Sequence, residues 1–302
     1  MTAEPPPAAL SVVVPSVNGW DDLRGCLAAL DGQRAEVDLE VLVADRVGQA
    51  TRAAIAAEFP RVRIIEAATG TTIPDLRAMA FEQASGTAVA VIEDHVLVPP
   101  GWARAMLACL ERGEDVVGGA VENAATDRLV DWAAFLCEYH HLLPPIAAGP
   151  VDSITGNNTV YRRSVLACYR DAWHAGRWER HLHDAMRRGG VRLYQHPEIV
   201  VGHKIHYTVG RYASQRFLYS RAYAGERVGG TPLARRLAYG AAALLLPPLL
   251  LWRVLRTVWG KRVHRQELVR SVPLIGLFTL AWGAGEMTGY WFGAGRALAR
   301  VR

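Results

Sequence analysis

Short apolar runs alternate with longer periodic stretches over the first two hundred residues of the chain. Runs that are rich in β-branched residues and bounded by turn residues are typical of buried strands. They predict strands at Leu10–Val14, Leu39–Asp45, Val62–Glu66, Thr87–Ile92, Val116–Asn123, Val191–Tyr194 and Ile199–Val201. We expect the last two to be separate strands.

Helical periodicity fills the stretches between these runs. Apolar residues that recur three or four positions apart predict helices. We expect helices from Asp21 or Asp22 onward, at Pro74–Ser85, from Trp102, at Asp127–His140 and at Trp178–Arg188. Strands that alternate with helices predict an α/β fold, in which helices cover both faces of a mostly parallel sheet.

The last third of the chain has a different pattern. Tyr207–Arg227 mixes arginines with aromatic residues and predicts an amphipathic helix that suits a membrane interface. Leu237–Trp252 is apolar for 16 residues, and Val272–Ala294 is apolar for 23 residues except for Glu286. Spanning a bilayer takes about 20 apolar helical residues, so only the second segment is comfortably long.

These patterns divide the chain into four parts. We expect a disordered lead at residues 1–9, a catalytic domain at 10–206, an amphipathic interface helix at 207–232 and a hydrophobic helical membrane-attachment segment at 233–302.

Charge separates the two halves of the chain. Residues 1–202 carry 18 Lys and Arg against 26 Asp and Glu, a net of −8, and residues 203–302 carry 16 against 3, a net of +13. The basic half is also the half with long apolar runs, which indicates an anionic membrane surface as the partner. We expect no nucleic-acid partner, because no helix-turn-helix, zinc-finger or RRM signature accompanies the charge.

The basic residues also bear on membrane topology. They precede, separate and follow the two apolar segments, so a simple two-span hairpin would place one basic group on the wrong side. We therefore expect at least the first segment to be re-entrant or interfacial, at the cell inner membrane, with the catalytic domain cytoplasmic. The alternative is that both segments are buried helices of a soluble domain.

The four cysteines and the N-terminus indicate a reducing compartment. Cys26, Cys109, Cys137 and Cys168 are far apart and form no CxxC pair, so the spacing indicates neither a zinc ribbon nor a disulfide framework. The first ten residues contain an acid and three prolines where a signal peptide has basic residues and an apolar run.

Polar residues gather where the predicted strands end. Open α/β sheets bind ligands at the carboxyl ends of their strands, and Glu93-Asp94-His95 follows one strand there. Glu93 and His95, two positions apart, can jointly hold a divalent cation that neutralises a diphosphate. Taken alone, the triplet is also consistent with a solvated acidic strand end. No GxGxxG or GxxxxGKS phosphate loop is present.

The order of the motifs is more specific than any one of them. The segments SVVVPSVNGWDDLRGCLAAL, LEVLVAD, LRAMAFEQASG and VAVIEDHVLVPPGW follow one another, and together they resemble family 2 glycosyltransferases of the GT-A fold over residues 10–203. The resemblance implies a nucleotide-diphospho-sugar donor and Mg²⁺ or Mn²⁺ as cofactor. It implies donor-binding roles for Pro15, Asn18, Asp45, Arg77, Glu93 and Asp94, and metal-binding roles for Glu93, His95 and His203.

Three departures from the family pattern affect the donor side. Glu-Asp-His replaces Asp-x-Asp, which leaves open whether Asp94 or His95 meets the metal. Ala78 replaces the usual Asn after Arg77, and Arg46-Val47-Gly48 replaces the usual Asn-Gly-Ser.

The resemblance also implies an acceptor side. Residues 178–197 resemble the family's acidic helix block, which aligns Glu179 with the general base that removes the acceptor proton. The alternative for Glu179 is a charge favoured at a helix N-terminus. Gly156-Asn157-Asn158 resembles the acceptor-side loop and could also be an ordinary turn.

These inferences predict one activity and leave two alternatives. The resemblance implies transfer of a sugar with inversion, and we expect the acceptor to be membrane-proximal and possibly lipid-linked. We expect non-processive transfer, because the Gln-x-x-Arg-Trp signature of processive synthases is missing. One alternative is a non-catalytic GT-A-like membrane scaffold or nucleotide-sugar-binding protein. A nucleotidyltransferase would need a basic glycine-rich loop after the first strand, where Pro15 to Gly19 contains no Lys or Arg.

Overall fold

A computed structural model describes residues 8–301, which divide into two compact units. The first unit comprises residues 8–122 and 144–204, and the second comprises residues 123–143 and 205–301. The range expected for the catalytic domain, 10–206, therefore contains a segment that packs with the C-terminal helices. Residues 1–7 of the predicted lead lie outside the described residues, whereas the Ala9 amide donates a 3.1 Å hydrogen bond to the Asp38 carbonyl.

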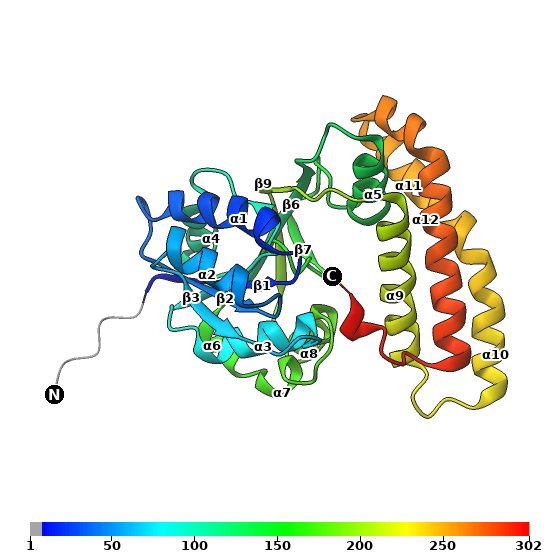
Figure 1. The fold of residues 1–302 in the computed structure, drawn as a ribbon, viewed down its shortest axis with the longest axis horizontal. Coiled ribbons are helices and arrows are strands. Elements are labelled where there is room, and N and C mark those ends of the chain that lie inside the picture. The colour runs from blue at the N-terminus through cyan, green and yellow to red at the C-terminus, as the bar shows by residue number, and fades with distance from the viewer. Residues whose placement is uncertain (1–7, 302) are drawn as a thin grey trace. The chain divides into compact units, whose positions relative to one another are not determined.

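A mixed sheet forms the centre of the first unit (Figure 1). The described strands are β1 (Leu10–Ser16), β2 (Leu39–Asp45), β3 (Arg63–Glu66), β4 (Ala88–Val91), β5 (Val96–Leu97), β6 (Val116–Asn123), β7 (Gly149–Val151), β8 (Thr159–Arg162) and β9 (Leu193–His203). Their order is β3-β2-β1-β4-β8-β6-β9-β5, and β7 pairs with β9. The strands β1 to β4 are parallel, so their carboxyl ends meet at one edge.

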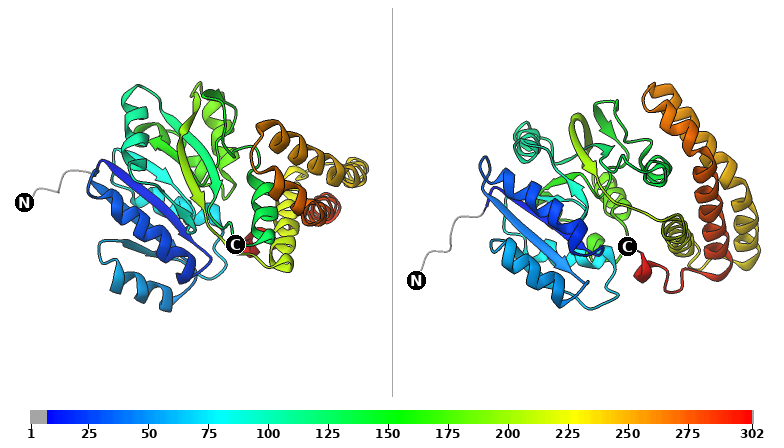
Figure 2. Two further views of the ribbon diagram at one scale, coloured as in Figure 1. Left: turned by 90° about the horizontal axis from the view of Figure 1, so that it is seen from above. Right: turned by 45° about the horizontal axis from the view of Figure 1, so that its top comes forward.

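Helices cover both faces of this sheet, as predicted (Figures 1 and 2). They are α1 (Trp20–Gln33), α2 (Gln49–Glu58), α3 (Ile73–Gln83), α4 (Trp102–Glu111), α6 (Arg163–Ala167), α7 (Arg170–Trp173) and α8 (Glu179–Arg188). Figure 1 shows α1 and α4 on one face and α3, α6 and α8 on the other. The second face buries one apolar cluster, in which Leu76 and Leu182 pack with the inward side chains of β1 and β2.

The second unit is helical. Its elements are α5 (Leu129–Tyr139), α9 (Val209–Arg227), α10 (Leu233–Ala242), the 3₁₀ turn Ala243–Leu245, α11 (Leu246–Lys261), α12 (Arg265–Phe292) and the 3₁₀ turn Leu298–Arg300. Small residues let α9 and α12 approach closely. A side chain added at Gly289 would place its Cβ 2.5 Å from the Arg221 carbonyl oxygen.

Two predicted elements differ from the structure. The two late strands are one strand, β9, because it pairs along its length with β5, β6 and β7 and continues through Pro197. The predicted amphipathic helix forms as α9, but two of its polar side chains, those of Gln215 and Arg216, are buried. Neighbouring helices of the second unit provide the packing that covers them.

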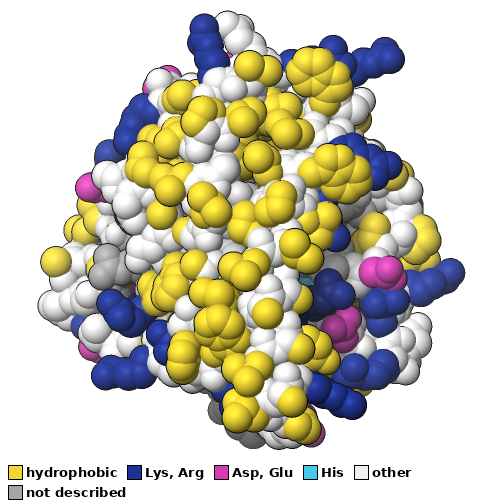
Figure 3. Space-filling model, turned by 90° about the vertical axis from the view of Figure 1, so that its right-hand side faces the viewer, with side chains coloured by type: hydrophobic (Ala, Val, Ile, Leu, Met, Phe, Trp, Pro, Cys, Tyr) yellow, Lys and Arg dark blue, Asp and Glu magenta, His cyan; other side chains and the backbone are white. Residues whose placement is uncertain are grey.

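Two helical segments are long and apolar enough to cross a membrane. They are Leu233–Lys261, which includes α10 and α11, and Arg265–Phe292, which is α12. Pro247 and Pro248 do not break the first segment, since Pro lacks only an N–H that the first turn of α11 leaves unpaired in any case. Exposed apolar side chains of these segments gather on one face of the helical unit, with Lys and Arg side chains around them (Figure 3).

Candidate active site

The turn after β1 is held by the middle residue of the acidic triplet. Asp94 is fully buried, and its Oδ2 accepts 2.8 Å hydrogen bonds from the amides of Val17 and Asn18. Its Oδ1 accepts a third bond of 2.8 Å from Asn18 Nδ2. Asp94 therefore shapes the β1–α1 turn and presents Asn18 at the carboxyl edge of the sheet.

The outer residues of the triplet converge with a histidine that is distant in the sequence. His95 Nε2 lies 2.9 Å from His203 Nε2 and 3.3 Å from Glu93 Oε2. Register explains the meeting, because β5 pairs with β9 so that Val96 lies opposite His203. One carboxylate and two imidazoles thus share a small volume, with their ligand atoms within 4.8 Å of one another.

Charge within this cluster is strongly coupled. Burial opposes protonation of His95, but hydrogen bonds to Asp94 and Glu93 outweigh it and raise the pKa of His95 to about 10. Burial likewise opposes ionisation of Glu93, and its hydrogen bond to His95 together with nearby cationic groups lowers its pKa to about 2. A proton held between Glu93 and the two histidines is what a divalent cation would replace.

The donor atoms fit such a cation. Ligands bound at about 2.1 Å lie roughly 3.0–3.4 Å apart around one ion, close to the 2.9 Å and 3.3 Å separations at His95. Imidazole suits transition metals and Mg²⁺ prefers oxygen ligands, so one carboxylate and two imidazoles fit a transition-metal ion better than Mg²⁺. Asp94 is not in the set, since both of its oxygens serve the β1–α1 turn.

Asp45 organises the neighbouring loop at the end of β2. Its buried carboxylate accepts hydrogen bonds from Ser16 Oγ at 2.9 Å, from the Gly48 amide at 3.1 Å and from Arg52 Nη1 at 3.1 Å. Since Ser16 and Asp45 are register partners, the ends of β1 and β2 present one continuous edge. Pro15 lies within β1, buried opposite Ala44.

Arg77 joins this edge to Glu179, the residue aligned with the general base. Its Nη1 donates a 2.7 Å bond to Glu179 Oε2, and its Nη2 donates a 3.1 Å bond to the Gly156 carbonyl. Arg77 is buried, which disfavours its charge, but Glu179 and Glu93 outweigh burial and raise its pKa above the ordinary arginine value. A Cβ at position 156 would lie 2.7 Å from Arg77 Nη1, so any larger residue there would displace the guanidinium.

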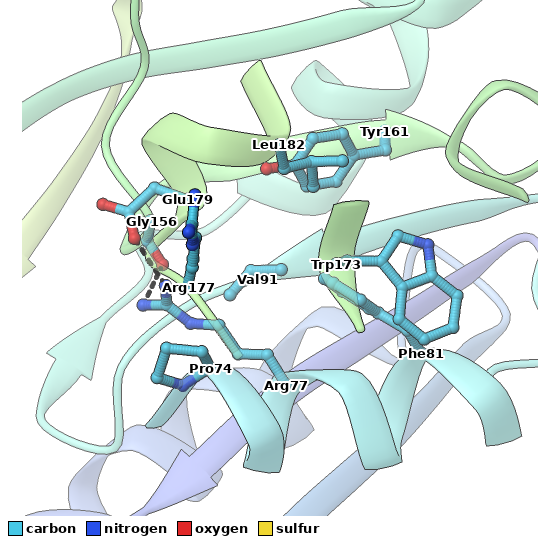
Figure 4. Close-up of a pocket in the computed structure, with 10 residues that line it drawn as sticks. All are labelled: Pro74, Arg77, Phe81, Val91, Gly156, Tyr161, Trp173, Arg177, Glu179 and Leu182. Atoms are coloured by element: carbon cyan, nitrogen blue, oxygen red, sulfur yellow. Dashed lines mark hydrogen bonds and ion pairs between the residues drawn. The ribbon is translucent and has the colours of Figure 1, made fainter. Parts of the chain in front are cut away.

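A pocket opens beside this ion pair (Figure 4). Its floor is apolar and aromatic, and the pair lies across from it in Figure 4. Its lining residues are Pro74, Arg77, Phe81, Val91, Gly156, Tyr161, Trp173, Arg177, Glu179 and Leu182.

The two asparagines of the predicted acceptor loop have different environments. Asn158 is buried and fixes the sheet, since its Oδ1 accepts from Trp102 Nε1 at 3.0 Å and its Nδ2 donates to the Ala120 and Ile199 carbonyls. Asn157 is buried as well, but its Nδ2 has no hydrogen-bond partner among residues 8–301, and neither has Arg77 Nε. Buried donors without partners are rare in native proteins and are commonly satisfied by a ligand or water.

Comparison with known proteins identifies the family of the chain. Residues 11–170, more than half of the chain, match the profile of the family described as "Glycosyl transferase family 2". The chain belongs to glycosyl transferase family 2. The crystal structure of S. aureus TarS 1–349 in complex with UDP is similar in fold, with a TM-score of 0.51 at 15% identity over 92% of this chain and 90% of that chain. No curated protein sequence matches this chain.

This glycosyltransferase therefore has the predicted GT-A fold, with two apolar helical segments after the catalytic sheet. The structure brings Asn18, Glu93, Asp94, His95 and His203 into one cluster and places Arg77, Glu179 and Gly156 in a second group. Electrostatic coupling between Arg77 and Glu93 links the two groups.

Sequence reasoning missed the aromatic part of the pocket. Phe81, Tyr161 and Trp173 come from α3, β8 and α7, and no motif connects them. Arg177 was missed too, although its position two residues before Glu179 was a usable signal.

Proposed function

We propose that this glycosyltransferase transfers a sugar, with inversion and one residue at a time, from a nucleoside-diphosphate donor to a hydroxyl of a membrane-proximal acceptor. One observation carries the proposal. A continuous line of charged and imidazole groups runs from His203 through His95, Glu93 and Arg77 to Glu179, beside an aromatic pocket. The groups at one end of this line can bind the phosphates of the donor, and the carboxylate at the other end can accept a proton.

The donor side is proposed to lie along the carboxyl edge of β1, β2 and β4. The loop that Asp45 holds, the end of β1 with Pro15 and the following turn with Asn18 face the base and ribose there. TarS, a protein of similar fold, has been crystallised in complex with UDP, which supports a nucleotide-bearing donor for this chain. Asp94 acts indirectly, because it fixes the turn that carries Asn18.

Glu93, His95 and His203 are proposed to hold a divalent cation, with Mn²⁺ preferred. When bound, such an ion neutralises the diphosphate and makes it a better leaving group. Arg77 supports the same end of the site, since its guanidinium adds a positive charge next to Glu93.

Glu179 is proposed as the general base. It accepts the acceptor hydroxyl proton while the oxygen forms a bond to the anomeric carbon. The bond from that carbon to the diphosphate oxygen breaks, and its electron pair leaves with the diphosphate. A single displacement from the opposite face inverts the configuration. Arg77 orients the carboxylate through the 2.7 Å contact, and Asn157 Nδ2 is available to bind a sugar hydroxyl.

The acceptor is proposed to be membrane-proximal. The two apolar helical segments expose large side chains, including Leu244, Leu245 and Trp252, that a hydrocarbon phase would cover. The net charge of +13 on residues 203–302 is consistent with an anionic membrane surface. A lipid-linked acceptor at the cytoplasmic face of the inner membrane would satisfy both features.

A transfer assay with the full-length protein in vesicles tests the proposal. A panel of nucleotide-sugars would be supplied with Mn²⁺, and both donor hydrolysis and transfer to extracted lipid would be measured. We expect Mn²⁺-dependent turnover of at least one donor, lost in the Glu93→Gln variant. Mn²⁺-dependent nucleotide binding without turnover of any donor would favour the non-catalytic scaffold, and a lack of binding would refute the donor site itself.

A further inference from the structure

A second group of metal-binding side chains lies at the other end of β9. Cys109 in the last turn of α4, Glu114 in the following loop and His196 on β9 place one ligand atom each within 4.8 Å of one another. His196 Nε2 is 2.8 Å from Glu114 Oε2. We propose that Cys109, Glu114 and His196 form a zinc site, with a water molecule as fourth ligand.

This group is distinct from the donor site. His196 and His203 lie seven residues apart on the same strand, which corresponds to roughly 23 Å at about 3.3 Å per residue. An odd separation also directs the two side chains to opposite faces of the sheet. One ion cannot serve both groups, so the zinc site has no part in binding the donor phosphates.

The chemical types of the three ligands favour zinc. A thiolate, an imidazole and a carboxylate are the usual protein ligands of Zn²⁺, whereas Mg²⁺ takes oxygen ligands. The surroundings are those of a metal-bound histidine, because Glu198 Oε1 lies 3.1 Å from His196 Nδ1 and directs Nε2 toward Glu114 and Cys109. A carboxylate on the far nitrogen is the common way to fix the tautomer and orientation of a ligand histidine.

Charge and access are also compatible with zinc. On binding, the Cys109 thiol loses its proton to solvent, and the thiolate and the Glu114 carboxylate neutralise the ion. The positive charge of Arg112, whose Nη2 is 3.0 Å from Cys109 Sγ, then balances the negative charge of Glu198. The side chains of Glu114 and His196 remain 17% and 14% exposed, so an ion can enter without unfolding of the sheet. Zinc would fasten α4 and its loop to β9.

Cobalt substitution tests the site with a signal that the donor site cannot give. Metal-free full-length protein would be titrated with Co²⁺, and the near-ultraviolet thiolate-to-cobalt charge-transfer band would be recorded. We expect the band to saturate at one equivalent and to disappear when Zn²⁺ is added. Glu93, His95 and His203 contain no thiolate, so cobalt bound there adds no such band.

Variants assign the band to its ligands. We expect it to be lost in Cys109→Ser and His196→Ala, and to need roughly 10-fold more Co²⁺ in Glu198→Gln. Cys168→Ser, at an exposed cysteine, and Cys26→Ala, beside the donor cluster, should keep it. Circular dichroism and nucleotide binding would show that each variant is folded. Absence of the band in the unmodified protein, or its persistence in folded Cys109→Ser, would overturn the proposal.

Discussion

Two buried arginine–glutamate pairs, one in each unit, have nearly the same exposure and different surroundings. The side chains of Arg77 and Glu179 are 7% and 23% exposed, and those of Arg216 and Glu138 are 7% and 24% exposed. The nitrogen–oxygen distances are 2.7 Å and 3.0 Å. Burial and pairing alone therefore do not distinguish the pair proposed to act in catalysis from a structural one.

The neighbours make the distinction. The Arg216 guanidinium lies over three aromatic rings, those of Tyr212, Tyr219 and Trp282, at 5.1–5.4 Å from their centroids. Arg77 instead contacts the Gly156 backbone beside a pocket and is coupled to Glu93. Cation–π contacts stabilise one pair in a single arrangement, whereas the other pair lines a pocket.

The largest expected effect is on turnover. Replacing Glu179 with Gln keeps the hydrogen bond to Arg77 and removes the proton acceptor, so kcat should fall about 10²–10⁴-fold with little change in thermal stability. The measurement is steady-state transfer to the acceptor, with a melting curve of the same preparation. The matched control is Glu138→Gln, which should melt earlier and keep kcat per folded molecule. Full turnover in Glu179→Gln would exclude it as the base.

The next effect is on stability. Arg216→Ala leaves Glu138 without its cation and removes three cation–π contacts, so the free energy of unfolding should fall by about 2–3 kcal/mol. Arg77→Ala should lower the free energy of unfolding by less, because water from the pocket can reach Glu179. Its main effect should be weaker donor binding. Urea unfolding in one detergent and nucleotide titration measure the two quantities. Equal stability losses would remove the proposed difference between the pairs.

A single added methyl group should disturb the pair formed by Arg77 and Glu179. Gly156→Ala places a Cβ 2.7 Å from Arg77 Nη1, so the guanidinium must shift and transfer should fall roughly 10–100-fold. Gly32→Ala is the control, since a Cβ at Gly32 in α1 meets nothing within 4 Å among the described residues. That variant should keep full activity. An unchanged rate in Gly156→Ala would show that the Arg77 position is not critical.

The smallest expected effect is a pH dependence of stability in the catalytic unit. Burial lowers the pKa of His183 to about 4, so between about pH 6.5 and 4 the unfolded chain binds a proton that the folded chain does not. This contribution to stability is present above pH 6.5 and decreases on acidification. Between pH 7 and 5.5 the unmodified protein should lose about 1 kcal/mol more than His183→Gln. Parallel loss in both proteins would contradict a neutral buried His183.

Local patterns were enough to place most elements of the catalytic unit. The sequence predicted β2 at Leu39–Asp45 and β6 at Val116–Asn123 with the observed ends, because a buried strand requires a run of apolar residues. It also predicted that the acidic triplet lies at a strand end, and the order of motifs was sufficient to predict the family. These features depend on neighbouring residues and could be inferred without tertiary contacts.

Contacts between distant residues decided the rest. Pairing of β5 with β9 brings His203 to His95, and hydrogen bonds from the amides of Val17 and Asn18 hold Asp94 at the β1–α1 turn. Helix packing buries Arg216, although it lies in a helix that the sequence predicted to suit a membrane interface. Cys109 and His196 are 87 residues apart, so spacing could not reveal their meeting. In each case an interaction depends on strand register or packing, which local sequence does not encode.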